Sequence, residues 1–432
     1  MKTEQSESLF QRCSGVVPGG VHSNFRAPIY FRTARGSRIW DVDGNEYIDY
    51  MVGNGACILG HADRDIESAV LEAVRRGLTA GLESELSLSV AIQLRDMIPC
   101  AERVRFANTG TEAVMKALMI ARAFTGKVKI IKVEGGYHGW FDEAQVSVHP
   151  DPALAGPARA PRPVLDADGF RPNTLDCVLV VPFNDAAALE EALEKNREKV
   201  AAVLIEPVMF NCGCVLPKHG YLSAVRELTR RHRVVLIFDE VITGFRLAPG
   251  GAQERFGVIP DLAVFAKAIA NGYPLSAVVG RGEMMDLSRP GGRVLYGGTY
   301  NGQYVVLAAA AACLAKLRDG AVQRRLQAAT RRLSEGFAEY AQALGLAARL
   351  EECGGQFQVF FVDRGITNYR DAQSADSKAF SEFQRVVLRE GIWMHRSYLF
   401  HHGVTFAHSD ADLDAALVAF NKGLRAVKAE RT

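Results

Sequence analysis

Short apolar runs alternate with helical patterns from about residue 60 to residue 300, and this alternation limits the fold more than any other feature. The runs read RVRFAN (103–108), KIIKV (129–133), CVLVVPF (177–183), AAVLIEPV (201–208), VVLIFDEV (234–241) and LAVFAK (262–267). Their length and their Val, Ile and Leu content predict buried strands, and the helical patterns between them predict crossover helices. We therefore expect an α/β fold with a mostly parallel sheet covered by helices on both faces.

The two ends of the chain follow other patterns. Residues 29–50 alternate polar and apolar side chains around the turn signal DVDGN, which predicts an antiparallel hairpin or meander. Beyond about residue 314 long helical patterns return, with a strand predicted in GGQFQVFFVD. Because 432 residues are too many for one simple core, we expect a large domain over residues 56–313. A smaller α+β domain would then combine residues 1–55 with residues 314–432.

The segment HPDPALAGPARAPRP (149–163) is rich in proline. Proline interrupts the interiors of helices and sheets, so we expect a loop without regular structure. A lid over a ligand site and a plain surface insertion are both open interpretations of this loop.

Composition excludes several classes of partner. The formal net charge is +2, which gives no indication of binding to nucleic acid or to an anionic membrane. The longest apolar run, YVVLAAAAACLA (304–315), is too short to span a bilayer and predicts a packed helix. The first residues, MKTEQSESLFQRCSG, lack the apolar core of a signal peptide, so we expect a cytoplasmic protein.

The eight cysteines are scattered, and none has C-x-x-C spacing. Cys212 and Cys214 form C-G-C, which alone is a weak indication of a metal site. Buried, reduced thiols are the better interpretation, so we expect neither a disulfide nor a bound metal.

Candidate site residues follow the predicted strands, where open α/β sheets bind ligands. Thr109, Gly110 and Thr111 follow the first run and lead into a helix, which is typical of a phosphate site but also of ordinary helix caps. EGGYHGW follows the second run; in it Tyr137 offers a flat face for stacking, although a core aromatic is an equal alternative. His138 is its neighbour.

Three further ionisable residues end strands: Glu206, Asp239 and Lys267. An ammonium within the apolar stretch around Lys267 is costly unless it has a chemical purpose. A lysine and an acid at strand ends, an aromatic ring for stacking and a phosphate-binding turn together indicate pyridoxal 5′-phosphate. The lysine amine would join the aldehyde of this cofactor and act as a base when released. Asp239 would keep the pyridine nitrogen protonated.

The chain resembles the class III (ω-type) aminotransferases of the fold type I pyridoxal-phosphate enzymes. The motifs IWDVDGNEYIDY, NTGTEA, GGYHG, VLIEPV, LIFDEVITGFR, PDLAVFAKAIANGYPLSAVVG and GGTYNG follow the order of that family and cover almost the whole length. The resemblance implies that Lys267 carries the cofactor and that Asp239 pairs with its ring nitrogen. It also implies contacts of Val241 and Tyr137 with the two ring faces, and of Gly110 and Thr111 with the phosphate.

The same resemblance implies a homodimer with shared active sites, in which Thr299 of GGTYNG reaches the phosphate in the neighbouring subunit. Within the family, PGGVHSNFRAP and GGAQERFGVIPDL are most similar to the glutamate-1-semialdehyde aminomutase group. In that group the residues that match Ser23 and Arg26 hold the substrate carboxylate, and a bidentate arginine contact suits that task. A surface charge is the alternative for Arg26.

One departure from the aminomutases lies near the C-terminus. Those enzymes read close to FEAGF, whereas this chain has YLFHHGVTFAHS, with His401 roughly in the place of the glutamate. This difference weighs against aminomutase activity. Arg396, Tyr398, His401 and His402 form a polar cluster that would bind a second anionic group of a substrate or simply form a surface turn.

The sequence thus favours an aminotransferase that moves an amino group between an amino acid and a keto acid by a ping-pong mechanism. Amino acids of β-, D- and aryl type are among the candidate substrates. The alternative is an aminomutase, epimerase or ammonia-lyase of the same family, acting on an amino acid or aminophosphonate. A cofactor-binding protein without activity is disfavoured, because binding alone requires neither Lys267 nor Asp239.

Overall fold

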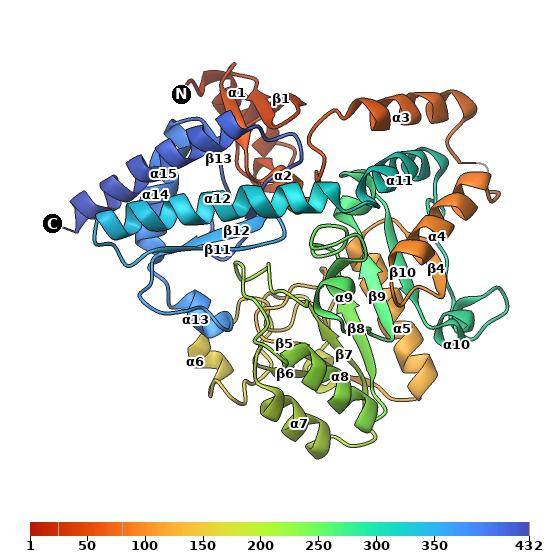
Figure 1. The fold of residues 1–432 in the computed structure, drawn as a ribbon. Coiled ribbons are helices and arrows are strands. Elements are labelled where there is room, and N and C mark those ends of the chain that lie inside the picture. The colour runs from red at the N-terminus through yellow and green to blue at the C-terminus, as the bar shows by residue number, and fades with distance from the viewer. Residues whose placement is uncertain (25, 80, 432) are drawn as a thin grey trace.

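The computed structural model describes residues 1–24, 26–79 and 81–431, and it is built around a seven-stranded sheet (Figure 1). The strand order is β4-β10-β9-β8-β7-β5-β6. The strands are β4 (Arg103–Ala107), β5 (Lys129–Val133), β6 (Val178–Val181), β7 (Val200–Ile205), β8 (Val235–Asp239), β9 (Leu262–Phe265) and β10 (Ser276–Gly280).

The direction of the strands confirms the predicted mostly parallel α/β sheet. Strand β10 runs antiparallel to both of its neighbours, β4 and β9, whereas β5 to β9 are parallel to one another. The sequence did not predict β10 as a strand. It follows β9 after a connection that holds only the short 3-10 helix η3 (Lys267–Ala270), too short for a crossover helix, and an antiparallel return needs none.

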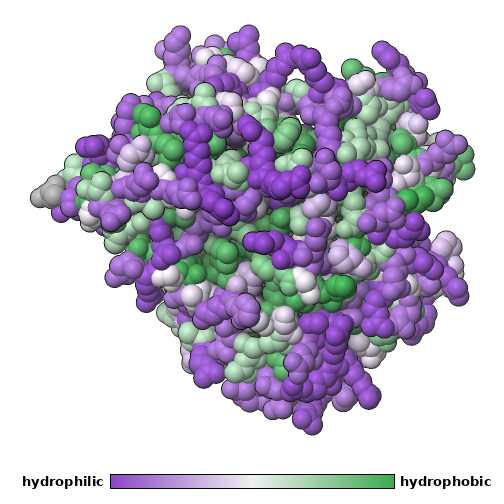
Figure 2. Space-filling view, in the orientation of Figure 1, coloured by the Kyte–Doolittle hydropathy of each residue, from purple (hydrophilic) through white to green (hydrophobic). Residues whose placement is uncertain are grey.

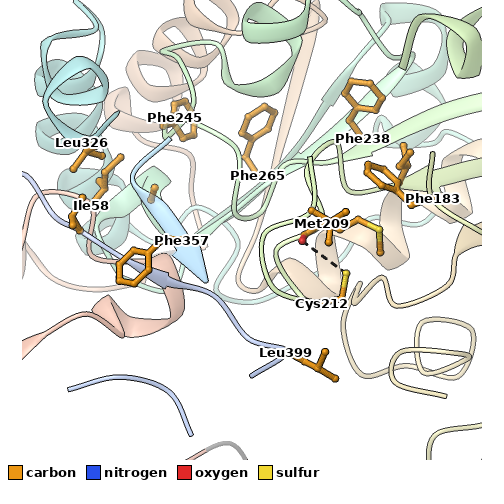
Figure 3. Close-up of a cluster of buried hydrophobic side chains, with 14 of the residues drawn as sticks. Ile58, Phe183, Met209, Cys212, Phe238, Phe245, Phe265, Leu326, Phe357 and Leu399 are labelled. Carbon is orange, nitrogen blue, oxygen red and sulfur yellow. Dashed lines mark hydrogen bonds between the residues drawn. The ribbon is translucent and has the colours of Figure 1, made fainter. Parts of the chain in front are cut away.

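Both faces of this sheet are buried, because alternate side chains of each strand point to opposite sides. In β8, Val235 and Ile237 join a core with helix α5 (Gly110–Thr125), whereas Leu236 and Phe238 join the larger core on the other face (Figure 3). The other helices of this part are α3 (Arg64–Arg76), α4 (Glu85–Met97), α7 (Ala186–Lys195), α8 (Tyr221–Arg231), α9 (Gly251–Phe256), α10 (Gly282–Met285) and α11 (Tyr304–Leu317).

The chain ends fold together beside the large sheet, as expected for a smaller α+β part. The predicted meander forms β1 (Phe31–Arg35), β2 (Arg38–Asp41) and β3 (Glu46–Asp49), and β13 (Ile392–Trp393) pairs with β3. A second sheet has the order β11-β12-β14, formed by β11 (Arg349–Cys353), β12 (Gln356–Phe360) and β14 (His402–Gly403). The longer helices of this part are α1 (Glu4–Ser14), α12 (Ala321–Ala343), α14 (Ser377–Arg389) and α15 (Asp410–Glu430), and α13 (Tyr369–Gln373) is short. The domain boundaries at residues 55 and 313 stay predictions.

The proline-rich segment corrects one expectation. It contains a single helical turn, α6 (Pro152–Ala155), where the sequence predicted only loop. Asp151 caps this turn by accepting a hydrogen bond from the Ala153 N–H at 2.9 Å, and proline is well suited to the first helical position.

Two observations concern the hydropathy of the surface and of the helices. Figure 2 shows mostly hydrophilic residues on one face, with hydrophobic residues visible near its middle, below α12. None of the helices in the described ranges is both long and apolar enough to cross a bilayer.

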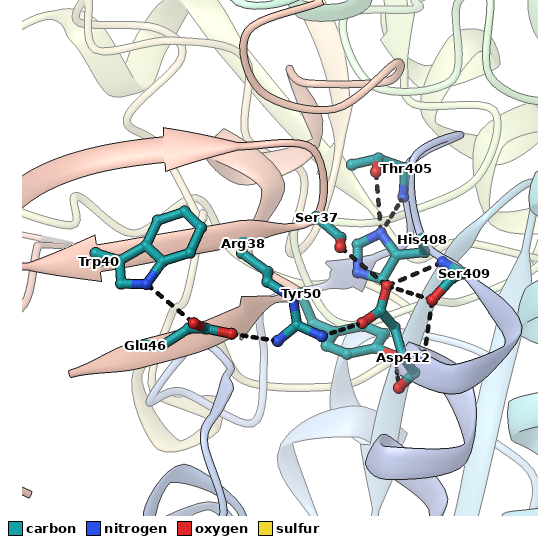
Figure 4. Close-up of polar contacts among 9 residues, drawn as sticks. All are labelled: Ser37, Arg38, Trp40, Glu46, Tyr50, Thr405, His408, Ser409 and Asp412. Atoms are coloured by element: carbon teal, nitrogen blue, oxygen red, sulfur yellow. Dashed lines mark hydrogen bonds and ion pairs between the residues drawn. The ribbon is translucent and has the colours of Figure 1, made fainter.

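Asp412, in the first turn of α15, ties the two chain ends together (Figure 4). Its carboxylate accepts hydrogen bonds from Ser37 Oγ at 2.9 Å and from Arg38 Nη2 at 2.8 Å. It also accepts the Ser409 N–H at 2.9 Å, which completes a capping box, and Tyr50 donates to its carbonyl oxygen. Burial acts to raise the pKa of Asp412, but bonds from Ser409 and Ser37 and the charge of Arg38 hold it below its ordinary value.

Asp412→Asn is therefore expected to reduce the free energy of unfolding by about 2 kcal/mol at neutral pH, because it removes a buried ionic acceptor. A lowered carboxyl pKa stabilises the fold above the ordinary value of about 4 and loses this effect as the pH falls through the folded pKa. Urea unfolding at several pH values measures both effects. The exposed Asp414→Asn in the same helix is the control, with an expected change below about 0.5 kcal/mol. Equal effects of the two variants would refute this role for Asp412.

Candidate active site

A cavity of about 290 Å³ opens at the carboxyl ends of β4, β7, β8 and β9. Its volume is near the lower end for small-molecule sites. Nine of the residues expected to bind a cofactor line it: Thr109, Gly110, Thr111, Tyr137, His138, Glu206, Asp239, Val241 and Lys267. Asn108, Asn211, Thr243 and Tyr273 also line it, and none of the four was predicted as a site residue from the sequence.

The N-terminus of α5 forms one wall of the cavity. Thr109 caps the helix by accepting the Glu112 N–H at 3.2 Å, and the first N–H groups of a helix attract anions. A Cβ on Gly110 would lie 3.0 Å from Val241 Cγ2, and one on Gly139, whose φ is +112°, would lie 2.7 Å from Thr111 Oγ1. Close backbone approach therefore requires glycine at position 139, and a Cβ at position 110 would press on Val241. The free N–H groups of this wall suit a phosphate.

Asp239 and His138 form a buried pair at the end of β8. His138 Nδ1 lies 2.7 Å from Asp239 Oδ2, and the Val241 N–H donates to Oδ1 at 3.1 Å. Burial lowers the pKa of His138, although Asp239 opposes this shift. A neutral imidazole next to a carboxylate carries its proton on the nitrogen that faces it. His138 therefore donates to Asp239 and fixes its orientation.

Glu206 holds the backbone that carries Tyr137. It accepts the Tyr137 N–H at 2.9 Å, the Phe210 N–H at 3.2 Å and Asn211 Nδ2 at 2.9 Å. Burial raises the pKa of Glu206 to about 7, and the nearby Asp239 adds to the increase. Asn211 has no spacing signal in the sequence, since it reaches the cavity through a loop rather than at a strand end.

Lys267 lies two residues after the end of β9, at the start of η3, and its φ is 50°, in the left-handed region. Such a backbone is strained for a residue other than glycine, and strain of this kind is enriched at functional sites. Burial lowers the pKa of the Lys267 amine to about 8; Glu206 and Asp239 oppose this shift, and Arg246 adds to it. A large fraction of the amine is thus free of its proton near pH 8, as a base requires.

Five predicted site residues are not part of the cavity lining: Ser23, Arg26, Thr299, Arg396 and His401. Arg26, Thr299 and Arg396 are exposed. Their proposed contacts with substrate or cofactor stay predictions.

The polar cluster predicted near the C-terminus is divided in the structure. His401 is buried, with Nδ1 3.0 Å from Phe210 O and Nε2 3.3 Å from Asn54 O. His402 is fully buried, with its ring 5.4 Å from that of Phe357. Tyr398 donates to Gln373 O at 3.3 Å.

Comparison with known proteins agrees with this geometry. The family model of the class III aminotransferases matches residues 21–424. The chain is 40% identical over 428 residues to a glutamate-1-semialdehyde 2,1-aminomutase of Methanothermobacter thermautotrophicus, covering 98% of this chain and 100% of that protein. Among solved structures it is similar to an omega-transaminase of Sphaerobacter thermophilus, with a TM-score of 0.92, 32% identity and coverage of 98% and 97% of the two chains.

A transaminase with bound pyridoxal phosphate is also similar, with a TM-score of 0.89, 29% identity and full coverage of both chains. Pyridoxal phosphate is the cofactor of this chain, and the residues of the cavity fit it: a lysine for the aldehyde, a carboxylate for the ring nitrogen and a helix N-terminus for the phosphate. The family match covers most of the sequence, and the fold and the donor set agree with it. The chain belongs to the class III aminotransferase family.

Proposed function

We propose that this chain is an aminomutase that moves the amino group of glutamate-1-semialdehyde from one carbon to its neighbour. One observation supports chemistry on an amino group: Lys267 and the Asp239–His138 pair line the same cavity as the N-terminus of α5. Pyridoxal phosphate supplies the electron-withdrawing ring that makes a proton on the substrate carbon acidic.

The residues of the cavity bind the cofactor and transfer the proton. Thr109, Gly110 and Thr111 bind the phosphate at the helix N-terminus, and Asp239, oriented by His138, keeps the ring nitrogen protonated. Tyr137 and Val241 hold the ring between them. The Lys267 amine takes a proton from one substrate carbon and returns it to another, a transfer for which a pKa of about 8 is suitable.

Similarity to relatives supports the choice of reaction. The aminomutase of Methanothermobacter thermautotrophicus is 40% identical to the chain over nearly the full length of both proteins. Such a reaction is an isomerisation, so it consumes neither an amino donor nor a keto acid. The sequence had placed aminotransfer first and this reaction among the alternatives, and the relatives support the alternative better.

Aminotransfer is the second candidate, and His401 favours it. This residue stands roughly where the aminomutases were expected to have a glutamate, and it is buried with both ring nitrogens close to backbone oxygens. The similar omega-transaminase of Sphaerobacter thermophilus supports the same candidate.

A second copy of the chain is the proposed partner. Thr299 lies in an exposed loop in which Leu295 is 82% and Tyr300 is 62% exposed. The loop contacts the cavity wall formed at the N-terminus of α5, because Asn108 Nδ2 donates to Asn301 Oδ1 at 3.3 Å. An apolar loop tip beside the site suits a contact across a dimer, where Thr299 would reach the partner's cofactor.

Lys267→Ala is expected to reduce turnover by about 10³-fold or more, because it removes the proton-transferring amine. The purified variant should also lose the visible absorbance of the cofactor joined to lysine, while its thermal unfolding stays close to that of the parent. Lys422→Ala, in an exposed ion pair with Glu390, is the control and should retain activity. Turnover by Lys267→Ala near the parent rate would contradict the assignment.

The reaction itself is tested by supplying glutamate-1-semialdehyde alone and following the product by mass spectrometry and NMR. An aminomutase should convert it to an isomer of unchanged mass with the amino group on the adjacent carbon, without any added keto acid. An aminotransferase should instead stop after one equivalent and continue only when a keto acid is added. The second outcome, or loss of the cofactor absorbance that pyruvate restores, would replace the first proposal by the second.

A further inference from the structure

Arg246 is a fully buried arginine bonded to backbone oxygens from distant parts of the chain. It follows β8 in the segment ITGFR. Its Nη1 donates to Val404 O at 3.1 Å, beside β14, and its Nη2 donates to Gly55 O at 2.9 Å. Within the described ranges it forms no ion pair with an Asp or Glu. A buried cation without a charged partner is costly, which indicates that its positive charge has a function.

Gln356 of β12 completes the contacts of the guanidinium. With its amide oxygen turned toward Arg246, it accepts Nε at 2.9 Å and Nη1 at 3.2 Å, and its amide nitrogen donates to His402 O at 2.6 Å. Every acceptor around Arg246 is thus an uncharged oxygen. Each nitrogen of the guanidinium thus donates at least one hydrogen bond, yet its positive charge is not cancelled.

One of these acceptors belongs to a strained turn at the edge of the cavity. The helix α2 (Val52–Gly55) has positive φ at all of its residues, 44° at Val52 and 55° at Asn54 among them. A left-handed backbone costs about 1–2 kcal/mol per residue other than glycine. Asp49 Oδ1 accepts the Val52 N–H at 3.0 Å, and Arg246 holds the other end. Ala56, the next residue, lines the cavity.

The same segment packs against the strand that leads to Lys267. The rings of Phe245 and Phe265 have centroids 5.2 Å apart, and both are drawn in Figure 3. A Cβ on Gly244 would lie 2.4 Å from Phe265 Cδ1, so the backbone lies directly on this ring. Phe265 is two residues before Lys267.

We propose that Arg246 is a positioning residue for Lys267: it joins the α2 turn beside the cavity to β12, and it keeps an unpaired positive charge on the segment that packs against the strand leading to Lys267. The inference rests on the role proposed above for Lys267. The test measures the proton on the Lys267 side-chain nitrogen. The role of Arg246 can therefore be refuted while the proposed reaction stands.

Three ionisable groups act on Lys267 from the elements around it, and a fourth, His401, lies near it. Glu206 after β7 and Asp239 at the end of β8 favour the ammonium, whereas Arg246 disfavours it. His401, beside β14, is kept neutral because burial, together with Lys267, lowers its pKa well below the ordinary value. Burial lowers the pKa of Arg246 only to about 10, with the Cys57 thiol opposing, so the guanidinium stays charged at neutral pH.

The test is the pH midpoint of the visible absorbance of the holoenzyme, which reports the proton on the nitrogen of Lys267. Arg246→Met should raise this midpoint by about one unit, because a nearby positive charge disfavours the protonated form. Arg246→Lys, which keeps the charge, should leave it near the parent value. Gln356→Met should leave the midpoint unchanged but lower the unfolding temperature, because it removes hydrogen bonds and no charge.

A parent-like midpoint in Arg246→Met, or an equal shift in Gln356→Met, would overturn the proposal. If Arg246→Met does not fold, Gln356→Glu tests the proposal instead. It places a carboxylate next to the retained guanidinium, which offsets the positive charge and should raise the pH midpoint. Gln358→Glu is its matched control: Gln358 is equally buried on the same strand but donates to Tyr398 O instead. No shift in Gln356→Glu, or the same shift in Gln358→Glu, would also overturn the proposal.

Discussion

The cost of burying one amine, that of Lys267, determines how the rest of the site is arranged. It stands at the end of an apolar strand, where an isolated ammonium is strongly disfavoured. The structure meets this cost by lowering the pKa of the amine to about 8 and by placing Asp239 and Glu206 nearby. Each carboxylate in turn has its own donors, from His138 to Asp239 and from Asn211 to Glu206. The amine therefore forces a chain of polar contacts that extends well beyond the cavity.

Parallel strands make this concentration of charge possible. Strands β7, β8 and β9 run in the same direction, so the residues that follow them meet at one edge. Glu206, Asp239 and Lys267 come from three strands far apart in sequence, yet they line one cavity. The connection from η3 to the antiparallel β10 stays at this edge, where Tyr273 also lines the cavity.

The residues that follow strands were predictable, and those that depend on loops were not. Asp239 and Lys267 were found because a polar residue directly after an apolar run has a fixed place in such a sheet. Asn211 and Arg246 reach their partners through irregular segments, so no periodicity marks them. The α2 turn was also missed, since its left-handed backbone is stabilised by contacts with Arg246 that lie nearly two hundred residues away in sequence. Strand β10 was missed because short connections leave no helical pattern before them.

The chain ends, rather than the large sheet, contain His401, the residue that favours the second of the two proposed reactions. Lys267 and Asp239 serve any transfer of an amino group, so they give no preference between isomerisation and aminotransfer. His401 and Asn54 come from opposite ends of the sequence and meet beside the cavity, with Arg246 fixing the turn that contains Asn54. The large sheet supplies Asp239 and leads to Lys267, whereas these end segments supply His401 and Asn54. Through Arg246 these end segments also bear on Lys267 itself, because Gly55 and Val404 both accept hydrogen bonds from the guanidinium that we propose acts on the lysine amine.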